Sequence, residues 1–406
     1  MSEKRCEIIM QKLKRFVAVF TTICLLFSMI GEASAEELLP VSAQLASTAP
    51  SFSEELPAKS YILIEASTGK VLAENNADEQ MPPASITKIM TMLLVMERID
   101  SGEISLDDMV TTSEHANSMG GTQIWLEVGE TMSVNDLLKA TAVNSANDAA
   151  VALAEYIGGS EDAFVEMMNE RAAELGMVNT TFKNATGLDA DGHVSTARDI
   201  AIMSQELLKH PLITDYTSIY MDSLRGGTTE LVNTNKMVRF YEGCNGLKTG
   251  TTDGAGSCLS ASATRDGMTL IAVTMGSPTS KERFASARSL LDYGFANYSL
   301  FTPEISDDEL TPILVKNGQK SSVSVELGEQ NSIVLPKGSL SKMEHEVILE
   351  PELQAPVAKG TEVGQIIFSL DGQSIAELPV LTSEDVDQLD FGFVFVGMLK
   401  NLLGIK

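Results

Sequence analysis

The sequence predicts a mixed α/β (α+β) domain, followed by a small all-β domain and a C-terminal amphipathic helix. Three observations support this prediction. Apolar residues recur at helical spacing through the first half of the chain, strand patterns occupy 244–276, and short alternating segments separated by Gly and Pro follow residue 300. The chain has 406 residues, 44% of them hydrophobic, which suits two or three domains.

The net charge of the chain argues against some classes of binding partner. Its formal net charge is -27, and so large a negative excess argues against a polyphosphate partner. Aromatic residues make up only 5% of the chain and Trp125 is the single tryptophan, so no platform for stacking bases is evident. We therefore predict no nucleic-acid partner. Repulsion between acidic surfaces is enough to explain the charge.

The N-terminus has the pattern of a secretory signal. Basic residues precede an uncharged run over 16–30, and Ala33-Ser34-Ala35 supplies the small residues of a cleavage site. This run is shorter than the roughly 20 residues that span a bilayer, although an uncleaved anchor helix is an alternative. We predict that residues 1–35 are removed on export. Residues 36–57, rich in Ala, Ser, Thr and Pro, are a predicted linker.

The first predicted domain covers residues 58–298. It should begin with a hairpin formed by strands at 61–64 and 71–73. Between Ser85 and about Ile99, apolar residues lie around most of a helical circumference, which predicts a buried central helix. Thr196, with Asp199 three residues later, marks another helix start. The remaining expected elements are helices at 133–142, 147–157, 161–175, 197–209 and 280–293, and strands at 244–251, 256–264 and 268–276.

The rest of the chain divides into two further parts. Residues 299–383 contain short alternating segments and predict an all-β domain. Residues 384–406 end in an apolar stretch whose uncharged run, 391–399, is too short to span a membrane. As a helix, this stretch gathers its polar residues on one side, which favours a helix lying in the membrane interface. Packing of the segment against its own domain is the alternative.

Cysteine and histidine residues give no metal or disulfide signature. After loss of residues 1–35, only Cys244 and Cys258 remain, and we favour two unreactive buried thiols over a disulfide. The chain has 4 histidines, and none belongs to a cluster with metal-ligand spacing, so no metal is expected. His193 lies in a polar turn before the helix that starts at Thr196, where a structural hydrogen bond is the favoured role.

The first candidate for chemistry is the sequence Ser85-Ile86-Thr87-Lys88. A serine hydroxyl is a weak nucleophile, and a lysine one helical turn away can activate it if burial keeps that lysine neutral. At a helix start, the backbone N–H of the serine is also free to stabilise an oxyanion. The pattern alone is weak, because two other segments match it, one starting at Ser67 and one at Ser339.

Two further motifs make the prediction specific. Ser145-Ala146-Asn147 places a hydroxyl and an amide at a helix entrance, although alone it reads as a helix cap. Lys248-Thr249-Gly250 lies on a predicted strand, where a cation and a hydroxyl can bind a carboxylate and Gly leaves room for a ligand. The three motifs occur in the order seen in β-lactamases and penicillin-binding proteins.

On these motifs the chain resembles the low-molecular-mass penicillin-binding proteins, specifically the serine-type D-alanyl-D-alanine carboxypeptidases of the peptidase S11 type. The resemblance covers about 57–385 and implies a penicillin-binding/β-lactamase-like transpeptidase fold. That fold has an antiparallel sheet with helices on both faces, and a small all-β sandwich follows it. Other segments of family type are 69–72, 83–85, 147–149, 184–188, 195–199, 233–235, 246–250 and 355–360.

The resemblance also implies the reaction. Ser85 attacks the carbonyl between two D-alanines, Lys88 takes its proton, and Ser145 passes a proton to the leaving D-alanine. The N–H groups of Ser85 and Thr251 form the oxyanion hole, and no cofactor is needed. The substrate-binding residues implied are Asn147, Lys248, Thr249, Gly250 and Thr251.

Implied partners are the D-Ala-D-Ala end of a peptidoglycan stem peptide, β-lactams as covalent inhibitors, and a membrane surface for the C-terminal helix. The expected location is the outer face of the bacterial cytoplasmic membrane. Two alternatives remain at this point. A class A-like β-lactamase is disfavoured because Ala146 replaces an acidic residue and no Glu-x-x-Leu-Asn stretch follows. The other is a non-catalytic protein that binds the wall or senses β-lactams on a retained fold.

Overall fold

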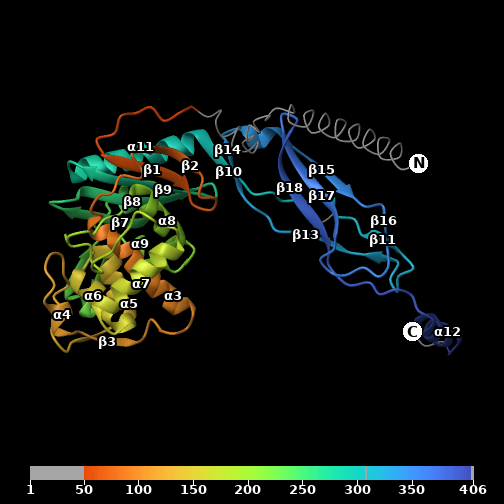
Figure 1. Cartoon of the computed structure of the whole chain (residues 1–406), viewed down its shortest axis with the longest axis horizontal. Helices are drawn as coiled ribbons and strands as arrows, with labels where there is room; N and C mark the ends of the chain where they lie inside the picture. Colours follow the sequence, from red (N-terminus) through yellow and green to blue (C-terminus); the bar gives the residue numbers. More distant parts are fainter. Residues whose placement is uncertain (1–49, 307–308, 404–406) are drawn as a thin grey trace, which may run out of the picture. The chain divides into compact units, whose positions relative to one another are not determined.

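The computed structural model describes residues 50–306 and 309–403. The predicted signal segment, with Cys6 and Cys24, lies outside the described residues. The first described domain is built around a five-stranded antiparallel sheet (Figure 1). Its strand order is β2 (Val71–Asn75), β1 (Ser60–Glu65), β9 (Met268–Ser277), β8 (Gly256–Arg265) and β7 (Cys244–Thr252).

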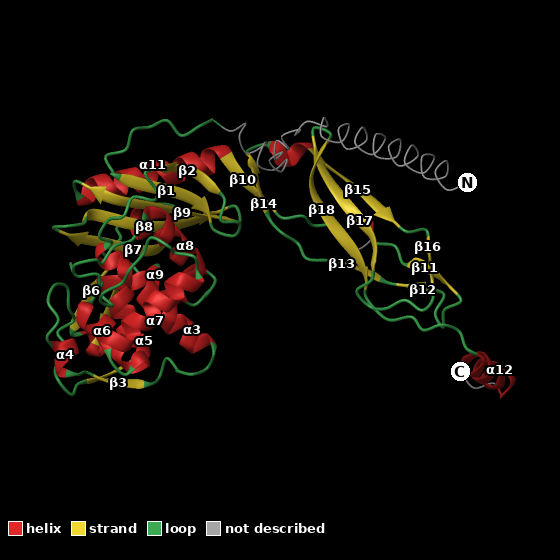
Figure 2. Ribbon diagram, in the orientation of Figure 1, coloured by secondary structure: helices red, strands yellow, loops and turns green. Residues whose placement is uncertain are grey.

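Helices cover both faces of this sheet, as Figure 2 shows. Helix α11 (Ser280–Asn297) packs on one face against β8 and β9, and α8 (Ala197–Leu208) packs on the other against β1 and β9. The expected antiparallel sheet with helices on both faces is thereby confirmed. Further elements of the helical side, the face covered by α8, are α3 (Lys88–Asp100), α4 (Glu114–Asn117), α5 (Val134–Lys139), α6 (Asn147–Gly158), α7 (Glu161–Glu174) and α9 (Ile213–Thr217). Helix α10 (Met237–Phe240) contacts β7, and its buried Met237 belongs to the same hydrophobic cluster as Leu290 of α11.

The alternation of side chains along β1 explains why its sequence is apolar without interruption. Ile62 and Ile64 join the core on the helical face, whereas Tyr61 and Leu63 join the core beneath α11. A strand buried on both faces needs apolar residues at every position, because neighbouring side chains point to opposite sides. A single short run thus anchors two hydrophobic cores.

The central helix differs from the prediction at its start. The expected helix from Ser85 divides into a short 3₁₀ turn, η1 (Ala84–Thr87), and helix α3, which begins at Lys88. From Lys88 to Met96 every residue is buried, so the prediction of a buried central helix is confirmed. The helix start predicted at Thr196 is confirmed as well, since its hydroxyl accepts a hydrogen bond from the Asp199 amide.

Short elements missing from the sequence prediction lie mainly around the helical side. They are too brief for a periodic pattern to identify them. They include the short helices α4, α9 and α10 named above and the π-helical turn η2 (Ala140–Asn144) that ends α5. Two hairpins were also missed, that of β3 (Met109–Thr111) with β4 (Thr131–Ser133) and that of β5 (Met221–Leu224) with β6 (Thr229–Val232).

The segment after α11 is rich in β-structure, which confirms the predicted all-β character. β10 (Tyr298–Phe301) pairs with β14 (Ile333–Pro336). One sheet has four antiparallel strands, β13 (Val325–Leu327), β18 (Gln373–Thr382), β17 (Glu362–Leu370) and β15 (Met343–Leu349). Another has three strands, β12 (Ser322–Val323), β11 (Ile313–Lys316) and β16 (Glu352–Gln354).

The C-terminal helix α12 (Phe391–Leu403) begins later than the segment predicted as an anchor. Val386, inside that predicted segment, is buried and pairs with Val357 of the β-rich part. The apolar side chains of α12 are exposed, with Phe391 at 84% and Leu402 at 83%. Within the described ranges, no helix is long and apolar enough to span a bilayer.

Cys244 and Cys258 are free thiols, as the sequence analysis favours. Cys258 is buried on β8 opposite Gly250, whereas Cys244 lies near the other end of β7 opposite Ala263. The antiparallel register therefore keeps the two sulfur atoms apart. Cys244 is half-buried rather than fully enclosed.

Gly294 sets how closely α11 approaches the sheet. A Cβ atom there would collide with Leu270 and lie 3.1 Å from Leu63 Cδ2. Overpacking of this kind typically costs about 1–3 kcal/mol. For Gly294→Val we expect a melting midpoint about 3–10 °C lower, measured by circular dichroism. Ala285→Val, at an exposed position of the same helix, is the control; an equal shift in both variants would contradict close packing at Gly294.

Candidate active site

The predicted site residues meet where three elements converge. Ser85 lies half-buried in η1, and Lys88 is fully buried at the start of α3. Ser145 and Asn147 flank the junction between η2 and α6, and both are nearly buried. Strand β7, which carries Lys248, packs directly against η1. Motifs that are far apart in the sequence therefore form one cluster.

The amine of Lys88 is the centre of this cluster. Its Nζ lies 3.1 Å from Ser85 Oγ, 2.6 Å from Asn147 Oδ1 and 2.7 Å from the carbonyl oxygen of Thr186. Burial, and next the positive charge of Lys248, hold the pKa of Lys88 well below its ordinary value of 10.5. Asp148 acts in the opposite direction but is the weakest of the three influences.

A neutral amine can form one hydrogen bond with each of these three neighbouring atoms. It carries two N–H bonds and one lone pair. Asn147 Oδ1 and the Thr186 carbonyl can accept only, so they take the two N–H donors. The lone pair is then left for the hydroxyl hydrogen of Ser85. The arrangement can thus draw a proton from the serine, which is the requirement for a serine nucleophile.

Ser145 is held in a constrained backbone conformation. Its φ of 64° lies in the left-handed region, directly after the π-helical turn η2. Such turns and such conformations concentrate at functional sites, because regular helix geometry would point the side chain elsewhere. The amide of Asn147 is fixed as well, since its Nδ2 donates to the Gly120 carbonyl at 2.7 Å while its Oδ1 faces Lys88.

Strand β7 supplies the cationic side of the site. Lys248 is 1% exposed, and its Nζ donates to the carbonyl of Thr249 at 3.0 Å. The hydroxyl of Thr249 donates to Thr234 Oγ1 at 2.7 Å. Burial, and next the charge of Arg283, lower the pKa of Lys248 to about 7. Near neutral pH this lysine is therefore close to the point where it gains or loses its charge.

Gly250 permits the close approach of β7 to the serine. A Cβ atom at this position would lie 2.9 Å from Pro83 O and 3.0 Å from Ser85 N. The space that glycine provides is thus taken by the turn carrying Ser85, whereas the sequence alone suggested room for a ligand. The backbone of Gly250 therefore lies against that of Pro83 and Ser85, and Thr251 follows directly on the same strand.

Arg283 is a site residue that the sequence analysis missed. It projects from α11, is 6% exposed, and donates from Nη1 to the Gly250 carbonyl at 2.9 Å and to Thr251 Oγ1 at 2.8 Å. It therefore fixes the end of β7 and adds a positive charge behind Lys248. No motif surrounds it, so only its place in the fold reveals it.

The loop that carries Thr186 is a second contribution that the motifs did not reveal. Gly187 has a φ of 82°, and a Cβ atom there would collide with the carbonyl of Ala84. His193 stabilises the same region, because its Nε2 lies 2.9 Å from Thr87 Oγ1 and its Nδ1 accepts from the Lys183 amide. Burial lowers the pKa of His193 to about 4, which agrees with the structural role expected for it.

The competing Ser-x-x-Lys segments lack such surroundings. Ser67 is exposed in the β1–β2 turn and its hydroxyl donates to Glu65. Ser339 and Lys342 lie in a short 3₁₀ turn, η5 (Ser339–Lys342), which contains no buried residue. The structure therefore distinguishes the three matches by burial and by neighbours.

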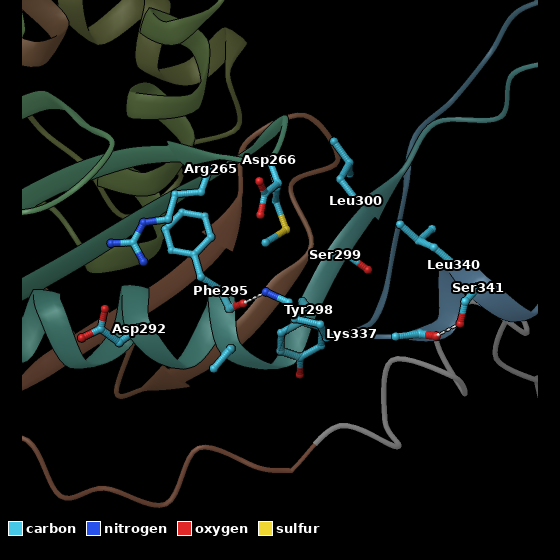
Figure 3. A pocket seen from close by; sticks show the side chains of 13 residues that line it. Arg265, Asp266, Asp292, Phe295, Tyr298, Ser299, Leu300, Lys337, Leu340 and Ser341 are labelled. Carbon is cyan, nitrogen blue, oxygen red and sulfur yellow. Dashed lines mark hydrogen bonds between the residues drawn. The ribbon is translucent and has the colours of Figure 1, made fainter.

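A separate cavity of about 570 Å³ lies beside β10 and the end of α11 (Figure 3). In it, Lys337 points to the carbonyl of Phe295 and donates to it at 2.7 Å. None of the predicted site residues lines this cavity. Across residues 50–306 and 309–403, no group of three or more His, Cys, Asp or Glu residues could hold a metal ion.

Comparison with known proteins agrees with this geometry. Residues 44–279 match the family described as D-alanyl-D-alanine carboxypeptidase (peptidase S11), and residues 298–388 match the C-terminal domain of penicillin-binding protein 5. D-alanyl-D-alanine carboxypeptidase DacF of Bacillus subtilis (strain 168) is 45% identical over 351 residues, covering 86% of this chain and 89% of the relative. DacC of Escherichia coli (strain K12) is 39% identical, covering 82% and 85%.

Solved structures agree as well. Penicillin-binding protein 5 from Haemophilus influenzae has a TM-score of 0.70 at 34% identity, covering 84% of this chain and all of that one. Penicillin-binding protein D2 from Listeria monocytogenes, in its ampicillin-bound form, has a TM-score of 0.55 at 35% identity and covers 60% of this chain and all of that one. The chain therefore belongs to the peptidase S11 family of serine-type D-alanyl-D-alanine carboxypeptidases.

Proposed function

We propose that this carboxypeptidase removes the terminal D-alanine from peptidoglycan stem pentapeptides through an acyl-enzyme on Ser85. The observation that carries the proposal is the buried Lys88 amine, whose Nζ lies 3.1 Å from Ser85 Oγ and also contacts Asn147 Oδ1 and the Thr186 carbonyl. Burial and the charge of Lys248 lower the pKa of this amine, which favours the neutral form that can accept the serine proton. Loss of the terminal D-alanine removes a donor for crosslinking, so the activity limits crosslinks in the cell wall.

The proposed acylation step uses these groups in turn. Ser85 Oγ attacks the carbonyl carbon between the two D-alanines as Lys88 accepts the hydroxyl proton. The N–H groups of Ser85 and Thr251 stabilise the oxygen that becomes negative. When the C–N bond breaks, Ser145 gives its hydroxyl proton to the leaving amine and takes up the proton that Lys88 received from Ser85, so that Lys88 is neutral again. The product is an ester on Ser85 together with free D-alanine.

Substrate orientation is assigned to the charged strand and to Asn147. Lys248 and Thr249 bind the terminal carboxylate, and Asn147 binds the peptide amide with the N–H that Gly120 does not use. Lys248 also helps to keep Lys88 neutral through its charge. A water molecule then attacks the ester, which releases the shortened peptide and restores the Ser85 hydroxyl. No step calls for a cofactor.

The same serine is the proposed target of β-lactams. A β-lactam presents a strained amide next to a carboxylate, so it fits the oxyanion donors and Lys248 as the peptide does. The ampicillin-bound relative supports this assignment. Membership in the carboxypeptidase family disfavours both the β-lactamase and the non-catalytic alternatives.

We also propose that the mature enzyme is exported and held at the outer face of the cytoplasmic membrane by α12. The exposed apolar side chains of this helix support the proposal, since burial in the membrane interface would remove them from water. Lys400 is the sole basic residue of the helix, so its attraction to anionic lipid is small compared with apolar burial.

Removal of the nucleophile or the base should abolish acylation. With purified protein and a stem pentapeptide, Ser85→Ala and Lys88→Ala are expected to lose D-alanine release by at least about 10³-fold. Neither variant should be labelled by fluorescent penicillin, although both should melt cooperatively. Ser67→Ala, at the exposed competing motif, is the matched control. Labelling of Lys88→Ala at the rate of the wild type would contradict its role as the base.

The pH dependence of kcat/KM should be bell-shaped. As the pH falls, protonation of Lys88 removes the base, so the rate decreases on the acidic side. As the pH rises above about 7, Lys248 loses its charge and the carboxylate is bound less tightly. Lys248→Arg keeps a charge at all these pH values, so its profile should lack the alkaline decrease. An unchanged alkaline limb in that variant would contradict the assignment.

Deletion of residues 391–406 should release active enzyme from membranes. The cut follows Asp390 because Val386 and Leu389 still hydrogen-bond within the β-rich part. D-alanine release per mole should equal that of the full chain, while membrane pelleting should be lost. The control is a full-length chain with Lys400→Gln, which should stay membrane-bound. Pelleting of the deleted form would show that another segment anchors the enzyme.

A further inference from the structure

One exposed aromatic residue near the active site takes no part in the reaction described above. Trp125, the single tryptophan of the chain, lies in the loop between α4 and β4 and is 75% exposed. Its φ of 59° places a bulky residue in the left-handed region. This conformation costs about 1–3 kcal/mol and persists only where the surroundings enforce it.

The residues next to Trp125 enforce its position. The carboxylate of Asp148, which is fully buried, accepts hydrogen bonds from Ile124 N at 3.1 Å and from Leu126 N at 3.0 Å. Arg225 donates to the carbonyl of Ile124 at 2.9 Å. Ile124 and Leu126 are each 1% exposed, so the backbone on both sides of Trp125 is fixed while the indole ring faces solvent.

The same loop contacts the catalytic cluster. The backbone N–H of Asn147 donates to the Thr122 carbonyl at 2.7 Å, and the side-chain Nδ2 of the same residue donates to the Gly120 carbonyl. Asp148, which fixes Trp125, is the next residue along α6. The indole ring is therefore presented by a rigid loop that begins at the active site.

The surface beside the indole carries an excess negative charge. Trp125 lines a cavity of about 460 Å³ together with Glu127, Glu130, Arg225 and other residues. Arg225 forms a two-pronged ion pair with Glu130, at 2.6 and 3.0 Å, so these two charges compensate each other. The exposed carboxylate of Glu127 is left in excess. An aromatic face next to a carboxylate is a typical environment for an ammonium group.

From this combination we propose that Trp125 and Glu127 form a subsite for a positively charged side chain of the donor peptide, upstream of its D-Ala-D-Ala end. The inference rests on the proposed carboxypeptidase function and adds a preference for peptides with a basic residue there. An ammonium over the indole and near Glu127 gains attraction that an acylated side chain lacks. Trp125 and Glu127 are specificity residues, remote from the reacting bond.

Two peptides that differ by one charge test the subsite. Nα-acetyl-L-Lys-D-Ala-D-Ala has a free ε-amine, and the Nα,Nε-diacetyl form does not. For Trp125→Ala and Glu127→Gln we expect kcat/KM on the free-amine peptide to fall about three- to thirtyfold through a higher KM. On the diacetyl peptide, kcat/KM should stay within about twofold of the wild type.

Controls separate this proposal from a structural effect and from failure of the function. Trp125→Phe should recover part of the loss, and Val178→Ala, at another exposed apolar position, should cause none. Equal losses on both peptides would overturn the subsite, as would no loss on the free-amine peptide. D-alanine release by the wild type is the separate test of function: no release from either peptide would overturn the proposed activity.

Fluorescence gives a readout that does not depend on turnover. Because Trp125 is the only tryptophan, its emission reports on this one position. In the Ser85→Ala protein, the free-amine peptide should shift the emission in a saturable way, with a dissociation constant at least about threefold lower than that of the diacetyl peptide. Equal dissociation constants for the two peptides would contradict the subsite even in a protein that cannot turn over.

Discussion

The buried amine of Lys88 is the group on which the rest of the active site depends. Burial, and next the charge of Lys248, hold the pKa of this amine well below its ordinary value, which favours the neutral form. A neutral amine in turn needs two acceptors and one donor. Asn147, the Thr186 carbonyl and Ser85 supply them from three separate segments. The catalytic geometry is therefore also the way in which a buried polar group is satisfied.

Close packing around this amine explains where the chain requires glycine. Gly250 lets β7 reach the turn of Ser85, and Gly187 lets the Thr186 loop reach the same turn from another direction. A side chain at either position would meet backbone atoms, which cannot rotate away. The serine is thus positioned by two backbone contacts, and Arg283 stabilises one of them from behind by binding the Gly250 carbonyl.

Much of the fold and the centre of the site could be predicted from the sequence because their signals are local. Strand β1 and helix α3 each have an apolar pattern that identifies them, and Ser85, Lys88, Ser145 and Lys248 lie in short motifs with a chemical meaning. Arg283 could not be predicted in this way. Its role comes from the packing of α11 against β8 and β9, from which its side chain reaches the Gly250 carbonyl on β7. No pattern in the neighbouring sequence indicates this contact.

The contribution of Thr186 was hidden for a different reason. It acts through a backbone carbonyl, which every residue possesses, so the identity of the side chain carries no information. The helix boundary at Ser85 was similarly beyond a periodic pattern, since a 3₁₀ turn and the first turn of an α-helix have almost the same spacing. The role of a side chain can be predicted from its residue type, whereas the role of a backbone group can be recognised only in the folded structure.

The central sheet pairs strands from opposite ends of the sequence of its domain. This pairing determines when, during synthesis and folding, the active site can form. β1 pairs with β9, so that Ser60 lies opposite Met275, and the segments that carry Ser85, Lys88 and Lys248 are encoded between them. Contacts between such distant residues form late, because a long loop must close before they are gained. Ser85 and Lys248 therefore come together only after nearly the whole domain has been synthesised. A chain that ends before β7 lacks Lys248 and Thr249, so the complete cluster around Ser85 forms only together with the fold of this domain.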